Sequence, residues 1–167
     1  MRRIRPIIFC AFVLAVVGTV AAQDKPKPGP GHDKLGYFLG NWKSEGDVKE
    51  SPFGPAGKFS TKDHCDWFDG KFAVVCHSDG KGPTGPTKSI GILGYNGEEK
   101  VYTYYGVGND GMTMMSIPRG TVQGDTWTYD DESMMGGKTM KSRYVIKQLS
   151  PTSYTFKWMM EGKSTKM

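Results

Sequence analysis

The sequence lacks the short motifs that mark the common classes of enzyme. It contains no Gly-x-Ser-x-Gly nucleophile elbow, no His-Glu-x-x-His zinc motif and no phosphate-binding Walker loop. Acidic pairs occur at Glu98-Glu99 and within Asp130-Asp131-Glu132, but they lie at or near expected turns and strand ends. Solvated surface charges explain these groups better than a general acid–base pair does. No residue is nominated as catalytic, no cofactor is expected, and a non-catalytic role is favoured.

The sequence also lacks an apolar run long enough to cross a bilayer as a helix. The run at residues 7–17 is shorter than the roughly 20 residues that a transmembrane helix needs. It follows a basic start (MRRIR) and precedes small residues that end at Ala22, which is the order of a secretory signal peptide. We expect residues 1–22 to be a cleaved signal peptide. The mature chain would then be periplasmic or extracellular, with no transmembrane segment.

Without the leader, the chain has only a small net charge. The whole chain has 22 Lys and Arg residues against 17 Asp and Glu residues. Three of the arginines and none of the acidic residues lie in the leader, so the mature chain has a formal net charge of +2. Its lysines are scattered, whereas a nucleic-acid-binding protein needs a clustered basic surface. We therefore expect no nucleic-acid partner.

Long helical patterns are missing as well. Residues 23–34 are polar and rich in Pro and Gly, so we expect a disordered linker there. The domain at 35–167 begins with residues that can form one helical turn, followed by short runs rich in aromatic and β-branched residues. A loop is expected at 80–86 (GKGPTGP). The expected strands are 41–49, 57–68, 72–79, 88–95, 100–107, 112–118, 125–133, 139–149 and 153–161, with a last short candidate at 163–166.

The spacing of these strands predicts the fold class. Nine or ten short strands joined mostly by tight turns indicate an all-β domain, a single antiparallel up-and-down barrel whose closure would remove its exposed edges. Alternation supports this prediction, because Tyr154, Phe156 and Trp158 share one face of their strand. In residues 100–107 both faces are apolar or aromatic, so the sequence leaves the inward face of that strand open.

Only three cysteines occur, and one of them lies in the leader. The remaining two, Cys65 and Cys76, suggest one disulfide in an oxidising compartment, with two buried free thiols as the alternative. In a hairpin whose loop residues are Gly70 and Lys71, the two cysteines face each other at a separation that a disulfide tolerates. A loop placed one residue earlier would put a valine opposite Cys65. A disulfide would therefore select the first register.

Histidine is equally scarce, and two of the three lie in this hairpin. The same register places His64 opposite His77, with Asp66 on the same face. Two imidazoles and a carboxylate could bind Zn²⁺ or Cu²⁺, although no fourth ligand is evident. Ordinary pairs on the polar face of the hairpin are the simpler alternative. Methionines in the second half of the chain fit core filling, an adaptable apolar cavity or Cu(I) binding.

The segment LGNWKSEG, residues 39–46, looks like the first strand of calycin-type barrels, in which a Gly-x-Trp motif closes one end. Here that motif is Gly40 and Trp42. Together with SPFGPAGKFSTKDHCDWFDGKFAVV and SIGILGYNGEEKVYTYYGVGNDG, it makes most of residues 35–162 resemble a secreted bacterial family known as domain of unknown function 1579. The resemblance implies a lipocalin-like barrel, often behind a signal peptide, with no established activity.

Three functions are compatible with these features. The first is binding of one small apolar molecule, such as a fatty acid or an isoprenoid-like lipid, inside the barrel. The second is a structural or interaction protein of the cell envelope whose interior is completely filled by side chains. The third is the metal site at His64 and His77. The oligomeric state is not predicted. The candidate lining residues for the first function are Tyr102, Tyr104, Trp127, Tyr129, Tyr144, Phe156 and Trp158.

Overall fold

The computed structural model describes residues 26–51, 54–109, 116–135 and 138–161. Two short helices come first, α1 (Pro30–Asp33) and the 3-10 helix η1 (Lys34–Phe38). No helix in this part of the chain is long and apolar enough to cross a membrane. Nine strands follow: β1 (Gly40–Val48), β2 (Gly57–Trp67), β3 (Ala73–Gly82), β4 (Gly85–Asn96), β5 (Val101–Gly108), β6 (Arg119–Gln123), β7 (Thr126–Met135), β8 (Lys138–Ser150) and β9 (Ser153–Glu161).

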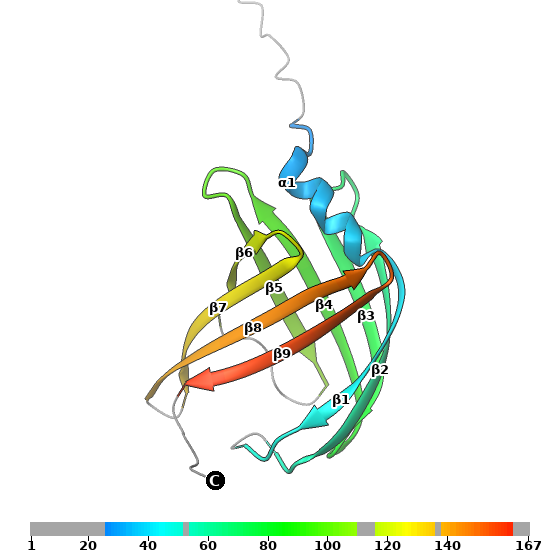
Figure 1. Ribbon diagram of the computed structural model, residues 1–167, viewed down its shortest axis with the longest axis vertical. Coiled ribbons are helices and arrows are strands. Elements are labelled where there is room, and N and C mark those ends of the chain that lie inside the picture. Colours follow the sequence, from blue (N-terminus) through cyan, green and yellow to red (C-terminus); the bar gives the residue numbers. More distant parts are fainter. Residues whose placement is uncertain (1–25, 52–53, 110–115, 136–137, 162–167) are drawn as a thin grey trace, which may run out of the picture.

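The strands form one antiparallel sheet in chain order from β1 to β9 (Figure 1). Tight turns and alternating side chains explain this arrangement, because each strand can pair with the next and keep one face dry. In β2, for example, Phe59 and Cys65 face the interior, while Lys58 and Lys62 are exposed. The predicted all-β, up-and-down, barrel-like fold is confirmed.

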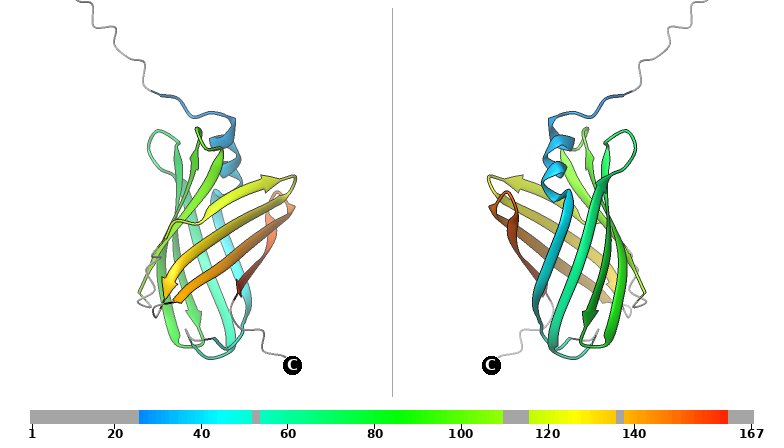
Figure 2. Two further views of the ribbon diagram at one scale, coloured as in Figure 1. Left: turned by 90° about the vertical axis from the view of Figure 1, so that its left-hand side faces the viewer. Right: turned by 90° about the vertical axis from the view of Figure 1, so that its right-hand side faces the viewer.

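The sheet curls into an incomplete barrel. Strands β1–β5 form one wall, and β6–β9 form a second wall that crosses the first at a steep angle (Figures 1 and 2). Within the described ranges, β1 and β9 have no backbone pairing with each other. Side chains span this seam: the rings of Trp42 and Tyr154 lie 5.0 Å apart, and the hydroxyls of Ser44 and Tyr154 lie 3.4 Å apart. The expected closure of the barrel is therefore corrected to a half-barrel with an open seam.

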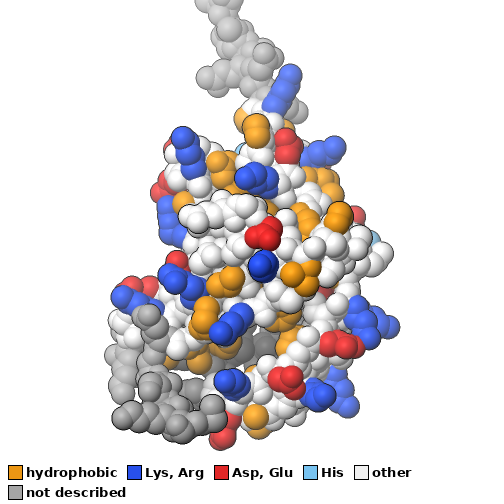
Figure 3. Space-filling view, viewed as in Figure 1, with side chains coloured by type: hydrophobic (Ala, Val, Ile, Leu, Met, Phe, Trp, Pro, Cys, Tyr) orange, Lys and Arg blue, Asp and Glu red, His pale blue; other side chains and the backbone are white. Residues whose placement is uncertain are grey.

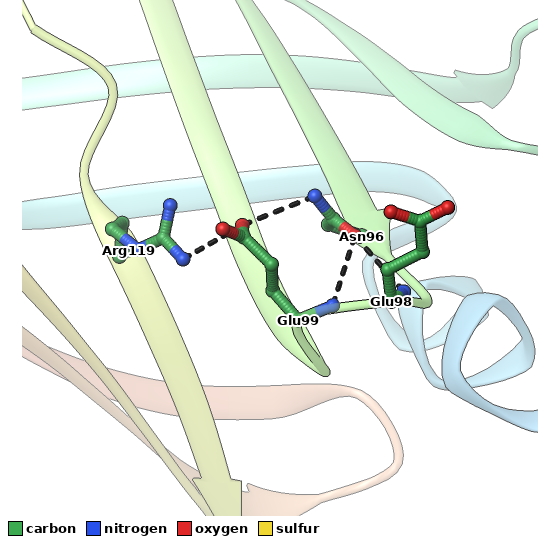
Figure 4. Close-up of polar contacts among 4 residues, drawn as sticks. All are labelled: Asn96, Glu98, Glu99 and Arg119. Carbon is green, nitrogen blue, oxygen red and sulfur yellow. Dashed lines mark hydrogen bonds and ion pairs between the residues drawn. The ribbon is translucent and has the colours of Figure 1, made fainter.

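The two walls meet at β5 and β6, which pair at Tyr102↔Gly120 and Thr103↔Arg119. Side chains reinforce this short ladder at the turn between β4 and β5. There, Arg119 Nη2 lies 2.7 Å from Glu99 Oε2 (Figure 4).

The Asn96 side chain fixes the same turn. Its Oδ1 accepts hydrogen bonds from the backbone N–H groups of Glu98, at 3.0 Å, and Glu99, at 3.1 Å (Figure 4). An Asn side chain that replaces a backbone acceptor in this way is a common turn-forming device. It holds Glu99 in place for its ion pair.

Several strand boundaries differ from the sequence expectations. A strand was expected at 112–118, but residues 116–118 are not in a strand, and the strand of this region is β6. The rest of that expected strand, and the last candidate at 163–166, lie outside the described residues. The expected loop at 80–86 shrinks to a tight turn, because the β3–β4 ladder continues to the pair Gly82↔Gly85. Gly85 has a φ of 125°, which glycine adopts without steric cost.

The β2–β3 hairpin has the predicted register. His64 pairs with His77 and Cys65 with Cys76, and the two cysteines form a disulfide. The turn contains Gly70 with a φ of 83°. The predicted disulfide and the register that it selects are therefore confirmed.

The two helices lie across one end of the curved sheet (Figure 2). Phe38 of η1 packs edge-on against Trp127, with ring centroids 5.0 Å apart. The Tyr102 hydroxyl donates a hydrogen bond to the Gly31 carbonyl at 3.0 Å. Regular structure thus begins inside the segment 23–34 that was expected to be a linker, since these contacts hold its last part on the sheet. The core at this end consists of Leu35, Phe38, Cys65, Val74, Leu93, Tyr102, Trp127, Tyr129 and Ile146.

Candidate functional site

The interior of the half-barrel contains a cavity of about 840 Å³ on the concave side of the sheet. Every strand except β6 contributes to its lining. Most of the lining side chains are aromatic or aliphatic, because the alternation in each strand sends these residues inward. In Figure 3 the surface is hollowed between β9 and β1, on the side of the open seam. The curved sheet is thus packed at the helical end and hollow beyond it.

The structure divides the predicted lining residues into two groups. Two of them, Tyr102 and Trp127, lie in the packed core with their rings 4.7 Å apart and do not line the cavity. The sequence did not show which face of β5 points inward. The structure shows that it is the face that carries Tyr102 and Tyr104. The residues that line the cavity are Tyr104, Tyr129, Tyr144, Phe156 and Trp158.

Glycine makes room for one of these rings. A Cβ atom at Gly91 would lie 3.0 Å from both Cε2 and the hydroxyl oxygen of Tyr104. Gly91 is the cross-strand partner of Gly106, and both residues line the cavity. A side chain at Gly91 would collide with the Tyr104 ring, so the position of that ring depends on this glycine.

The Gly-x-Trp motif lies where the helices join the sheet. Gly40 has a φ of 95°, which turns the chain from η1 into β1. The Trp42 indole N–H donates a hydrogen bond to the Phe38 carbonyl at 2.8 Å, and its ring forms part of the cavity wall. The motif therefore holds the helical segment against the sheet next to the seam.

Sequence reasoning missed one inward-facing carboxylate, Asp63, and wrongly assigned a second, Asp131, to the solvated surface, because Asp131 lies within β7 on its inward face. Asp63 accepts hydrogen bonds from Thr61 Oγ1, at 3.1 Å, and from Ser78 Oγ. Asp131 accepts one from Ser116 Oγ at 2.5 Å. All of these side chains line the cavity. The alternation of β2 contains the signal, since residue 63 is in phase with the inward cysteine two positions later.

The Asp63 carboxylate affects the pKa values of tyrosines that line the same cavity. Burial raises the pKa of Tyr144, and the neighbouring phenols of Tyr154 and Tyr104 and the Asp63 carboxylate raise it further. Burial, then Asp63, then Tyr154 likewise raise the pKa of Tyr104. These phenols are therefore neutral at physiological pH and able to donate or accept hydrogen bonds. Together with Asp63 they form one polar part of the cavity wall.

One polar atom of the wall has no hydrogen-bond partner in the described part of the protein. The Tyr129 side chain is 3% exposed, and its hydroxyl is buried and unpaired. Burying an unpaired hydroxyl costs about 1–3 kcal/mol. Other atoms of Tyr129 line the cavity, but the hydroxyl itself is shielded from it.

The residues proposed for a metal site lie on the outer face of the hairpin and are exposed. His64 Nε2 lies 2.8 Å from Asp66 Oδ2, and His64 Nδ1 lies 2.9 Å from Asn41 Oδ1, so both ring nitrogens have partners. In the part of the chain that the structure describes, no group of three His, Cys, Asp or Glu side chains is placed to hold a metal ion. The metal site at His64 and His77 stays a sequence prediction.

The sequence of this half-barrel matches one known family. No curated protein matches the chain. The sequence model of a family described as a protein of unknown function (DUF1579) matches residues 27–167, which include both helices, all nine strands and the whole cavity lining. The chain therefore belongs to the DUF1579 family.

Proposed function

We propose that this protein is exported and binds one small, largely apolar molecule in the cavity of its half-barrel. The observation that carries this proposal is the cavity of about 840 Å³ with its mostly aromatic and aliphatic wall. Ligand pockets commonly have volumes of about 300–1,000 Å³, apolar walls and a few polar groups that orient the ligand. Here the polar groups are Asp63, Asp131 and the hydroxyl side chains that bind them.

The main competing function is a structural envelope protein with a filled interior. Filled protein interiors are close-packed, because each void forfeits the dispersion contacts of the atoms that line it. The helical end of this protein is packed in that way around Trp127, which is 1% exposed. The other half is not, and that contrast within one domain supports the binding function.

Two features support export. The leader at residues 1–22 has the order of a secretory signal peptide, although it lies outside the described residues. The Cys65–Cys76 disulfide suits a periplasmic or extracellular location, because cytosolic thiols are kept reduced.

The test uses residues 23–167, exported through a bacterial periplasm and purified without detergent. The protein is titrated with N-phenyl-1-naphthylamine, an apolar fluorophore that is uncharged at neutral pH, and we expect saturable binding. The variant Ser142→Trp places an indole in the cavity and should abolish that binding. The variant Lys141→Trp places the same side chain on the exposed face one residue earlier and should leave binding unchanged.

Native mass spectrometry of the same preparation gives a second measurement. A small-molecule adduct that disappears on denaturation would support the proposal. If the folded protein binds no fluorophore and stays free of adducts after incubation with a lipid extract, the binding function is wrong and the structural function takes its place.

A further inference from the structure

We propose that the cavity selects apolar amines, and that the cationic head group of the ligand binds at Asp63. This inference deepens the proposed binding function and rests on it. It concerns the chemistry of the ligand head group, whereas the apolar wall alone would accept many hydrophobic molecules.

The Asp63 carboxylate is held in place by the protein but keeps free acceptor positions. Two hydroxyl donors, those of Thr61 and Ser78, hold both oxygens in one orientation inside the cavity wall. A carboxylate offers about four acceptor positions, so these two donors leave capacity for a ligand. An ammonium group, which has only donors, complements that remaining capacity.

The two faces of the sheet differ in their charged side chains. The lining contains the acids Asp63 and Asp131, and no Lys, Arg or His occurs among the described lining residues. Two acids of the outer face have cationic partners there: Asp79 lies 2.9 Å from Lys88, and Asp130 lies 2.6 Å from Arg143. The inward acids are bound by hydroxyls instead. A charge in an apolar site is stable only when it is paired, and a ligand cation would supply the pair.

Aromatic rings in the cavity wall lie near the acid. Tyr104, Tyr144 and Tyr154 all line the cavity. The negative charge of Asp63 acts on each of these phenols and raises its pKa. Aromatic faces attract cations, and the attraction grows when water is excluded.

The same charges disfavour a fatty acid. Its carboxylate would approach Asp63 and Asp131 with no cation in the described lining to offset the repulsion. The fatty acid suggested by apolar composition alone is therefore replaced by a ligand of opposite head-group charge. An uncharged decyl alcohol should fall between the two.

The test compares decylamine, decanol and decanoate as competitors of N-phenyl-1-naphthylamine at neutral pH. In the wild-type protein, decylamine should bind about tenfold more tightly than decanoate or better, as expected for a hydrogen bond to a charged group. The variant Asp63→Asn should remove most of that preference while it still binds the uncharged fluorophore, which shows that its cavity is intact. The matched control Asp66→Asn alters an exposed acid of the same strand and should leave the preference unchanged.

The outcomes separate the two proposals. If the fluorophore binds but the three decyl compounds compete equally, or decanoate competes best, the amine inference is overturned and the binding function stands. The amine inference is also overturned if Asp63→Asn keeps the full preference for decylamine. If wild-type protein binds neither the fluorophore nor any decyl compound, the binding function itself fails.

Discussion

Two tryptophans on the concave side of the sheet have very different surroundings. Trp127 is 1% exposed and touches the rings of Phe38 and Tyr102 at the packed end. Trp158 is 50% exposed and lies at the cavity. The same side chain therefore stabilises the fold at one position and borders the site at the other.

This contrast leads to a paired prediction for stability. Trp127→Ala should lower the free energy of unfolding by about 3–5 kcal/mol, because it leaves a void in a packed core. Trp158→Ala should lower it by about 1 kcal/mol or less, since half of that side chain is already in water. Urea unfolding followed by circular dichroism measures both values. Equal losses for the two variants would contradict the division into a packed end and a hollow end.

Residue-scale reasoning from the sequence found the aromatic part of the cavity wall but not its polar part. Tyr104, Tyr144 and Phe156 were found because aromatic residues at alternating positions predict an inner face. Asp63 was missed because a search for apolar periodicity passes over a polar residue in phase with the apolar ones. Only the curvature of the sheet shows that the carboxylate and the phenols share one space.

At the scale of elements, the β2–β3 hairpin is the strand pair with a covalent link. Its disulfide joins residues 11 positions apart and fixes the register of the two strands. A one-residue slip would turn Asp63 outward and His64 inward, since side chains alternate between the two faces. The geometry of the cavity wall therefore depends on this hairpin.

Removal of the link should be measurable. The double variant Cys65→Ser/Cys76→Ser should lose roughly 2–3 kcal/mol of unfolding free energy, because a short closed loop in the unfolded chain is released. The comparison is made by urea unfolding, with the wild-type protein in reducing agent as the control. The reduced wild type and the double variant should unfold at similar urea concentrations, and an unchanged midpoint in both would contradict a stabilising role.

The elements themselves were predictable to different degrees. The hairpin register followed from Cys65 and Cys76 because their pairing has strict geometric requirements. Strand β6 was misplaced because RGTVQ is short and contains a glycine, which makes its strand signal weak. The open seam could not be predicted, because strand spacing in the sequence does not determine whether the first and last strands meet.

At the scale of the whole molecule, the buried phenols couple stability to alkaline pH. Burial raises the pKa of Tyr129 and Tyr144 in the folded protein, whereas the same groups titrate near about pH 10 in an unfolded chain. Their contribution to stability is complete below that pH. Above it, the unfolded chain releases protons that the folded protein retains, so stability falls as pH rises.

The corresponding prediction concerns the slope of this loss. Each buried phenol should lower the unfolding free energy by about 1.4 kcal/mol per pH unit above about pH 10. Tyr144→Phe removes one such group, so its stability should fall less steeply than that of the wild type between pH 8 and about pH 11.5. Exposed groups titrate alike in both proteins and cancel in the comparison. Parallel curves would show that Tyr144 is ionised as readily in the folded protein as in the unfolded one.

The docking of η1 across the end of the sheet also has a consequence for the order of folding. Each strand pairs with its neighbour in the chain, so the hairpins can form one after another from local contacts. Phe38 precedes all nine strands, but its partner Trp127 belongs to β7. The helical segment must therefore wait for a strand far along the chain, and the packed end closes only after β7 has joined the sheet.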